Sequence, residues 1–135
     1  MKKLLFLLFF VVSFNSLGQT FDEYYQSGFN KAEDGDYYGA IADFTKAIEL
    51  DSNIYPNIFA YAGRGLAKVE LKDYYGAIAD FTKAIELDPN YVSAYVFRGS
   101  AKDNLGDLRG ACADWKKASN LGYANAEKWV AEQCN

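Results

Sequence analysis

The sequence predicts an all-α fold, with three stacked helix-turn-helix units and a C-terminal capping helix that together form an α-solenoid. Three observations support this prediction. The stretch DYYGAIADFTKAIELD occurs twice, at residues 36–51 and 73–88. Related residues recur beyond it at intervals of 37 and then 34 residues. Apolar residues within it fall on one helical face. A repeat of this period cannot bury its apolar face alone, so the copies must stack and share a core.

Residues 1–18 have the layout of a signal peptide. Two lysines precede an unbroken apolar run at residues 4–12, and Ser16 and Gly18 occupy the two positions that a signal peptidase reads. We therefore expect cleavage before Gln19 and a protein that is exported, either periplasmic or secreted. An uncleaved anchor is the alternative, but spanning a bilayer takes roughly 20 apolar residues. The position after the cleavage point is not Cys, which also disfavours a lipoprotein.

The composition fits one folded domain over residues 19–135 and disfavours several classes of function. The chain is 50% apolar and 17% aromatic, which suits a packed core. Without residues 1–18 it has 12 basic and 18 acidic residues, a net charge of −6. Binding nucleic acid needs a basic face, so that partner is not expected, nor is membrane insertion after signal cleavage.

The residue inventory also argues against catalysis. There is no His and there are only two Cys, so the usual general bases, thiol nucleophile pairs and zinc clusters cannot be assembled. Any enzyme would rest on carboxylates, Lys and Tyr alone. We expect no enzymatic activity, no cofactor and no metal.

The three units should occupy about residues 21–54, 58–91 and 92–123, and the cap helix about 124–134. In the first unit the apolar residues fall at i, i+4, i+7 and i+8, which is one helical face. Aligning the three units gives columns of equivalent residues. Three of these columns are Gly28, Gly65 and Gly99; Ala40, Ala77 and Ala111; and Phe44, Phe81 and Trp115. A Gly facing an Ala lets two helix backbones approach closely, and the aromatic column fills the remaining space.

An acid recurs in the turn between the two helices of each unit, at Asp36, Asp73 and Asp107. A carboxylate at this position accepts backbone N–H groups that have no partner within the helix. We therefore expect each acid to cap the second helix of its unit.

These columns resemble the tetratricopeptide repeat. The chain as a whole resembles a short exported bacterial protein of that family. The repeat has a 34-residue period and a pattern that includes aromatic-x2-Leu-Gly, Ala-x3-Phe and a closing Pro. The second unit matches most fully, through Tyr61, Gly65, Ala77, Phe81, Ala84 and Pro89. The first unit departs from the pattern by closing with Ser52. Three extra residues within 53–57 are expected to lengthen one loop.

The last helix should cover the apolar face that a terminal repeat leaves exposed. Ala126, Trp129 and Val130 lie on one face of it. Cys112 occupies an inward column and Cys134 ends this helix, so antiparallel packing brings the two thiols together. Two neighbouring thiols in an exported chain are expected to form a disulfide. Such a bond stabilises the folded protein by roughly 3 kcal/mol in the chain-entropy model. The alternative is a buried Cys112 and a free thiol at Cys134.

Charged residues also recur at the repeat spacing. Arg64 and Arg98 form one column on the first helices, and Asp43, Asp80 and Asp114 form another on the second helices. Opposite charges at this spacing favour a ladder of ion pairs between helices, in which each exposed pair contributes about 0 to 1 kcal/mol. The alternative is that the two arginines form an anion site.

The resemblance implies that the first helices line a concave groove that holds a peptide or helix of a partner protein. Carried over by column, the groove residues are Tyr25, Phe29, Phe59, Ala62, Leu66, Val69, Ser93, Val96, Ser100 and Asp103. The alternative is that Phe29 and Leu66 only complete the core. The clamp of Lys, Asn and Arg that holds a chaperone's C-terminal carboxylate is not supported, because its columns carry Tyr25, Phe29, Gly63, Ser93 and Phe97.

The leading functional hypothesis is a non-enzymatic protein-protein interaction scaffold that binds a protein segment in this groove. A second hypothesis is a solenoid that assembles with itself into a homo-oligomer. A third is a carbohydrate-binding or hydrolytic envelope protein that uses the many Tyr and carboxylate side chains, although most Tyr residues occupy packing columns.

Overall fold

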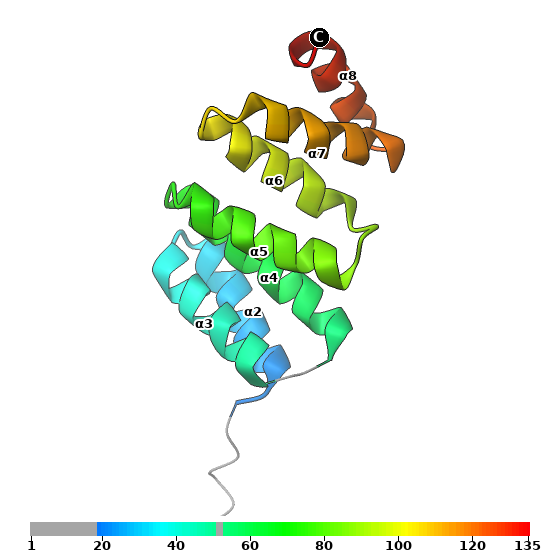
Figure 1. The fold of residues 1–135 in the computed structure, drawn as a ribbon. Helices are drawn as coiled ribbons and strands as arrows, with labels where there is room; N and C mark the ends of the chain where they lie inside the picture. The colour runs from blue at the N-terminus through cyan, green and yellow to red at the C-terminus, as the bar shows by residue number, and fades with distance from the viewer. Residues whose placement is uncertain (1–18, 51–52) are drawn as a thin grey trace, which may run out of the picture.

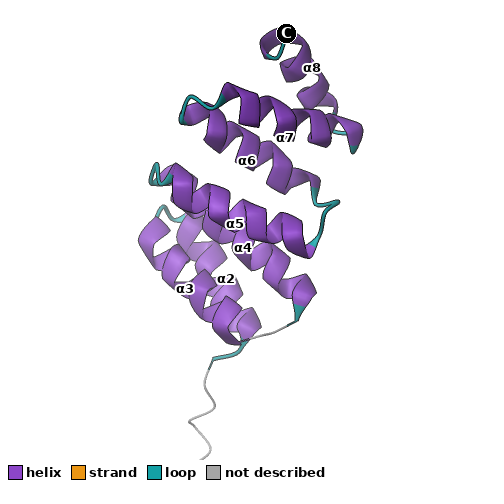
Figure 2. Ribbon diagram, in the orientation of Figure 1, coloured by secondary structure: helices purple, strands orange, loops and turns teal. Residues whose placement is uncertain are grey.

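The computed structural model describes residues 19–50 and 53–135, which form seven α-helices and no strand (Figures 1 and 2). In chain order the helices are α2 (Phe21–Glu33), α3 (Tyr37–Leu50), α4 (Ile54–Glu70), α5 (Tyr74–Leu87), α6 (Val92–Asn104), α7 (Leu108–Asn120) and α8 (Ala124–Gln133). The predicted all-α repeat fold is therefore confirmed. The predicted signal peptide lies outside the described residues. None of the described helices has the length and apolar character needed to span a membrane.

The helices form consecutive pairs that stack along the molecule, with α8 at the far end (Figure 1). Each helix packs against its neighbours in the chain, and in addition α2 contacts α4 and α4 contacts α6. No comparable contact joins the second helices α3, α5 and α7 in the described part of the chain. The first helices therefore lie closer together, on the inner side of the stack.

The turn between each pair of helices combines two capping devices. Asp36, Asp73 and Asp107 accept the backbone N–H of the residue three positions later, at 2.9, 3.0 and 2.9 Å. This confirms the predicted capping of the second helices. The preceding helix ends in a Schellman motif; after α4, for example, Lys72 N–H donates to the Val69 carbonyl and Asp73 N–H to the Lys68 carbonyl.

The glycines of the first helices face the aromatic side chains of the second. A methyl group added at Gly65 would lie 2.9 Å from the Phe81 ring, and one at Gly99 would lie 2.6 Å from Trp115 Nε1. Real side-chain atoms do not approach so closely, so only Gly leaves room for these rings. Phe44 and Phe81 are accordingly the largest fully buried side chains among the described residues.

The core forms three clusters, and each joins one helix pair to the first helix of the next pair. Phe44 packs with Ala60 and Ala67 of α4, and Phe81 packs with Ala94 of α6. Trp115 packs with Ala126 of α8, and the partly buried Trp129 and Val130 lie against the same cluster. The apolar face predicted for the last helix therefore covers the end of the solenoid.

One loop prediction is wrong. Residues 53–57 were expected to lengthen the loop between the first two units, but α4 begins at Ile54, so most of them add a turn to that helix. Pro56 does not prevent this, because the N–H groups of a first helical turn have no partner within the helix anyway. The added turn carries Ile54 and Tyr55, which are 55% and 79% exposed.

Candidate functional site

Besides Ile54 and Tyr55 on the added turn of α4, four large apolar side chains are exposed along the first helices. Phe29 on α2, Phe59 and Leu66 on α4, and Phe97 on α6 keep 45%, 48%, 38% and 39% of their surface in solvent. We call these four residues the apolar row. Single exposed apolar residues are ordinary, but a row across three adjacent helices is typical of a contact surface.

A pocket of about 400 Å³ opens between α2 and α4 at two members of this row. Its volume lies near the lower end of the range for small-ligand pockets, about 300 to 1,000 Å³, so it can accept an apolar side chain. The lining residues are Phe29, Ala32, Glu33, Tyr37, Phe44, Gly63, Leu66, Ala67 and Glu70. A side chain would not fit at position 63, because a methyl group there would lie 2.7 Å from the Phe44 ring.

The ten predicted groove residues differ in how much surface they offer. Phe29, Phe59, Leu66, Ser93 and Asp103 are exposed, and Tyr25, Val69 and Ser100 are partly buried. Ala62 and Val96 are buried at 7% exposure each, so their side chains pack inward and offer no open surface. Phe97 was not among the ten, although it stands in the column of Gln26 and Gly63, and its aromatic side chain there was the available signal.

Part of this surface also packs against the core. The Phe97 ring stacks on Phe81 with centroids 6.0 Å apart, and the Phe59 ring meets Tyr91 edge-on at 5.8 Å. Phe97 and Phe59 thus have one face fixed and one face in solvent. A surface held in place before binding loses little conformational freedom when a partner arrives.

The ladder of ion pairs is present and lies deeper than expected. Arg64 donates to both oxygens of Asp80, from Nε at 2.9 Å and from Nη2 at 2.7 Å, and Lys68 Nζ lies 2.8 Å from the same carboxylate. Arg98 and Lys102 hold Asp114 in the same way, at 2.6 to 2.9 Å.

The predicted ladder is therefore confirmed, but its pairs are not exposed ones, because Asp80 and Asp114 are each only 3% exposed. The guanidinium groups also link successive units. Arg64 Nη1 donates to Thr45 Oγ1 on α3, and Arg98 Nη1 donates to Thr82 Oγ1 on α5. Both arginines already hold a bidentate carboxylate partner, which disfavours the alternative of an anion site.

The first unit has a weaker version of the same arrangement. Asp43 accepts a hydrogen bond from Ser27 Oγ at 2.6 Å and lies 2.8 Å from Lys31 Nζ. Desolvation opposes ionisation of Asp43, but the hydrogen bonds from Lys31 and Ser27 outweigh it and lower the pKa of the carboxyl. The hydrogen bond between Lys31 and Asp43 raises the pKa of Lys31.

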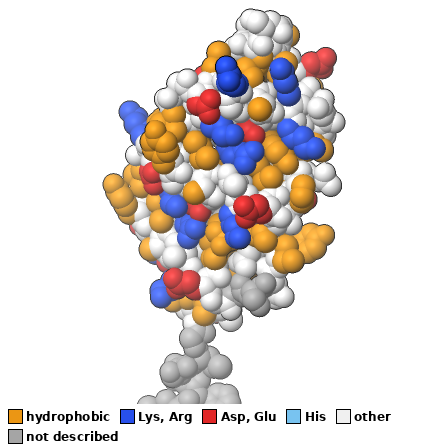
Figure 3. All heavy atoms as spheres, viewed as in Figure 1, with side chains coloured by type: hydrophobic (Ala, Val, Ile, Leu, Met, Phe, Trp, Pro, Cys, Tyr) orange, Lys and Arg blue, Asp and Glu red, His pale blue; other side chains and the backbone are white. Residues whose placement is uncertain are grey.

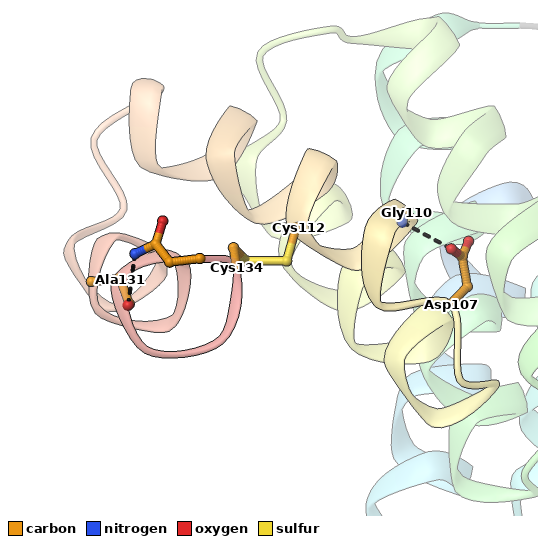
Figure 4. The surroundings of a disulfide bond; sticks show 6 residues. Asp107, Gly110, Cys112, Ala131 and Cys134 are labelled. Carbon is orange, nitrogen blue, oxygen red and sulfur yellow. Dashed lines mark hydrogen bonds between the residues drawn. A yellow bond between two sulfur atoms is a disulfide. The ribbon is translucent and has the colours of Figure 1, made fainter.

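The two cysteines lie together at the C-terminal end (Figure 4). They form a disulfide that joins α7 to the residue that follows α8. A hollow of about 550 Å³ next to them is lined by Leu108, Arg109, Cys112, Ala113, Lys116, Gln133, Cys134 and Asn135.

The described residues offer no cluster of three or more acidic, Cys or His side chains that could hold a metal ion. On the face viewed in Figure 3, basic and acidic side chains are interspersed with apolar ones. The basic and acidic side chains of the ion-pair ladder are held in structural pairs.

Comparison with solved structures finds close matches over most of the chain. The second TPR of Spaghetti (RPAP3) bound to the HSP90 peptide SRMEEVD is 31% identical, with a TM-score of 0.71 and coverage of 76% of this chain and 93% of that one. The first TPR of the same protein with the same peptide is 25% identical, with a TM-score of 0.78 and coverage of 86% and 91%. The second TPR domain of human RPAP3 in complex with the HSP70 peptide SGPTIEEVD is 28% identical, with a TM-score of 0.73 and coverage of 85% and 98%.

Comparison with sequence models of protein families agrees with this. One model described as tetratricopeptide repeat matches residues 58–91, and another with the same description matches residues 24–54. Comparison with curated proteins gives no significant match. Proteins of the matched type are scaffolds and generally not enzymes. The repeat columns, the stacked helix pairs and the structural matches lead to one conclusion, that this chain belongs to the tetratricopeptide repeat family.

Proposed function

We propose that this protein is a non-enzymatic scaffold that binds a peptide or helix of another protein along its first helices. The observation that carries the proposal is the apolar row with its pocket of about 400 Å³ between α2 and α4. Apolar grooves between helices accept the anchor side chains of peptides and amphipathic helices. Similar domains bound to HSP90 and HSP70 peptides support the same general role.

The mode of binding that we propose differs from a carboxylate clamp. The residues at the clamp columns of this chain are Tyr25, Phe29, Gly63, Ser93 and Phe97, none of which is basic. Without cations in these positions, burial of apolar side chains must supply most of the affinity. Phe29 and Leu66, which both line the pocket, are therefore the proposed anchor sites.

The proposed setting is outside the cytoplasm. Residues 1–18 would direct export and be removed before Gln19, leaving three repeat units and the capping helix as the mature protein. The bonded pair Cys112 and Cys134 supports this proposal, because disulfides persist in oxidising compartments.

Selection from a displayed library of random dodecapeptides tests the binding role. The purified protein should enrich a recurring set of peptides, and the Phe29→Glu/Leu66→Glu variant should bind these peptides at least tenfold more weakly. The matched control is Tyr38→Glu/Tyr75→Glu. It changes two aromatic side chains on the second helices that are 75% and 77% exposed, and it should leave affinity unchanged.

Two results would contradict the proposal. One is a library that yields no peptide above background. The other is a peptide set whose affinity is lowered equally by the groove variant and by the control. If the groove variant instead converts an oligomer of the purified protein into a monomer, as judged by mass in solution, self-assembly replaces peptide binding as the function.

A further inference from the structure

The basic side chains of the first helices are all engaged by aspartates of the second helices. In the described residues, α2, α4 and α6 together carry five basic residues, and each lies within 3 Å of a carboxylate oxygen. They are Lys31 with Asp43, Arg64 and Lys68 with Asp80, and Arg98 and Lys102 with Asp114. The ion-pair ladder therefore leaves no first-helix cation unpaired to meet an incoming ligand.

The unpaired charges of the same helices are all negative. Glu23 caps α2 by accepting the backbone N–H of Thr20 at 3.0 Å, but Asp22, Glu33, Glu70 and Asp103 form no ion pair within residues 19–50 and 53–135. The turns that follow α2, α4 and α6 add four aspartates and a single lysine, Lys72. The surface around the first helices is thus acidic.

Two of these unpaired acids lie beside the apolar row. Glu33 and Glu70 both line the pocket that contains Phe29 and Leu66. They occupy the same place in their helices, since each is the last residue of α2 or of α4. An apolar side chain that fills the pocket would therefore bring the adjoining residues of its own chain next to two carboxylates.

We propose that the bound segment carries an apolar anchor flanked by Lys or Arg. This inference rests on the proposed binding function and specifies the partner's chemistry. A basic flank would meet Glu33 and Glu70, while its alkyl stem could lie along Phe29 and Leu66. An acidic flank would meet like charge, which is the usual way in which an interface rejects a wrong partner. The preferred charge is opposite to that of the acidic peptides SRMEEVD and SGPTIEEVD.

The library selection can test this directly. The enriched dodecapeptides should have a net positive charge, with Lys or Arg within two or three positions of an aromatic or aliphatic residue. The best peptide should bind Glu33→Gln/Glu70→Gln about threefold to tenfold more weakly than the original protein, the size expected for loss of two exposed ion pairs. Its affinity for the original protein should fall as NaCl rises, and the dependence should be weaker in the variant.

A matched control separates a local effect from a general change of charge. Glu49→Gln/Glu86→Gln removes the same two charges from α3 and α5, where these acids pair with Lys46 and Lys83. Affinity for the basic peptide should change less than twofold in this control. An equal loss in both double variants would overturn the inference.

The remaining outcomes distinguish this inference from the proposed function. Enrichment of neutral or acidic peptides whose binding still depends on Phe29 and Leu66 would overturn the charge preference and leave the scaffold function standing. Failure to enrich any peptide would overturn the scaffold function, and this inference with it.

Discussion

At the residue scale, the turns that follow α2, α4, α6 and α7 each contain one backbone position with a positive φ. Gly35, Gly106 and Gly122 hold that position with φ of 82°, 80° and 97°, and Lys72 holds it with φ of 59°. A residue with a Cβ atom is destabilised by about 1 to 2 kcal/mol in this left-handed region. Lys72 is the only described residue other than Gly with a positive φ.

Replacing Lys72 by Gly should therefore stabilise the protein. The gain should be at most about 1 kcal/mol, because relief of the left-handed strain is partly offset by the greater freedom of Gly in the unfolded chain. Urea unfolding of the original protein and of Lys72→Gly measures it. Gly35→Lys is the reciprocal control and should destabilise. A loss of stability in Lys72→Gly would contradict the assignment of strain.

The Asp43 carboxyl predicts a pH dependence in the acid range. Its pKa is lowered in the folded protein, so the unfolded chain binds more protons than the folded chain as the pH falls below about 4. The stabilisation is present above the unfolded pKa and is lost as the pH falls through the folded pKa. Asp43→Asn should therefore lose less stability between pH 7 and pH 3 than the original protein does.

Urea unfolding at the two pH values provides the measurement. Lys31→Met should also reduce the loss of stability between pH 7 and pH 3, because it removes one of the hydrogen bonds that lower the pKa of Asp43. If Asp43→Asn lost as much stability between pH 7 and pH 3 as the original protein, this carboxyl would not contribute to the pH dependence.

At the scale of the element, α3 and α5 have the same sequence but different surroundings. Both read YYGAIADFTKAIEL. The aspartate of α3 meets Ser27 and Lys31, whereas that of α5 meets Arg64 and Lys68 and is more deeply buried. The first helix of each unit therefore decides how strongly the second helix is held.

Removing the carboxylate of Asp80 should be among the most damaging single changes in the chain. Asp80→Ala leaves Arg64 and Lys68 partly buried without their partner, and breaking a buried pair in this way costs about 3 to 5 kcal/mol. Urea unfolding should report this loss. Glu86→Ala on the same helix is the control; its carboxylate is exposed, so the cost should be below about 1 kcal/mol. Equal costs would contradict the importance of burial.

The sequence predicted the elements better than it predicted the exposure of their side chains. Turn acids, aligned glycines and the period of apolar residues depend on local geometry, so the helices and their caps could be predicted from them. The burial of Asp80 depends on how closely two helices approach, which a column of charges does not reveal. For the same reason Val96 was expected on the open surface and Phe97 was missed, although the two are adjacent in the chain.

At the scale of the whole molecule, the stack is closed differently at its two ends. The C-terminal end has α8 packed on the last pair and covalently tied to α7, whereas in the described residues no such tie joins α2 to its neighbours. In a solenoid each unit is stabilised mainly by the units next to it. Covalent reinforcement should therefore act first on α8 and α7.

The variant Cys112→Ser/Cys134→Ser tests the covalent tie. The two residues are 22 positions apart, and opening a loop of that size should lower the free energy of unfolding by about 3 kcal/mol in the chain-entropy model. Amide hydrogen exchange should rise most in α8, and the reduced original protein should behave like the variant. Exchange that rises equally in all helices would contradict a local role.

The identical sequences of α3 and α5 also affect how the chain can misfold. Either helix could pair with α2 or with α4, within one molecule or between two, and exchange of equivalent elements is a common failure of repeat proteins. The side chains that face the shared aspartate differ, however, since α2 presents Ser27 where α4 presents Arg64. An α4 that loses its partner helix to another molecule would leave Arg64 and Lys68 without a carboxylate partner. The arginine column therefore disfavours intermediates in which α4 has no partner helix. It favours the state in which α3 and α5, although identical in sequence, pair with α2 and α4.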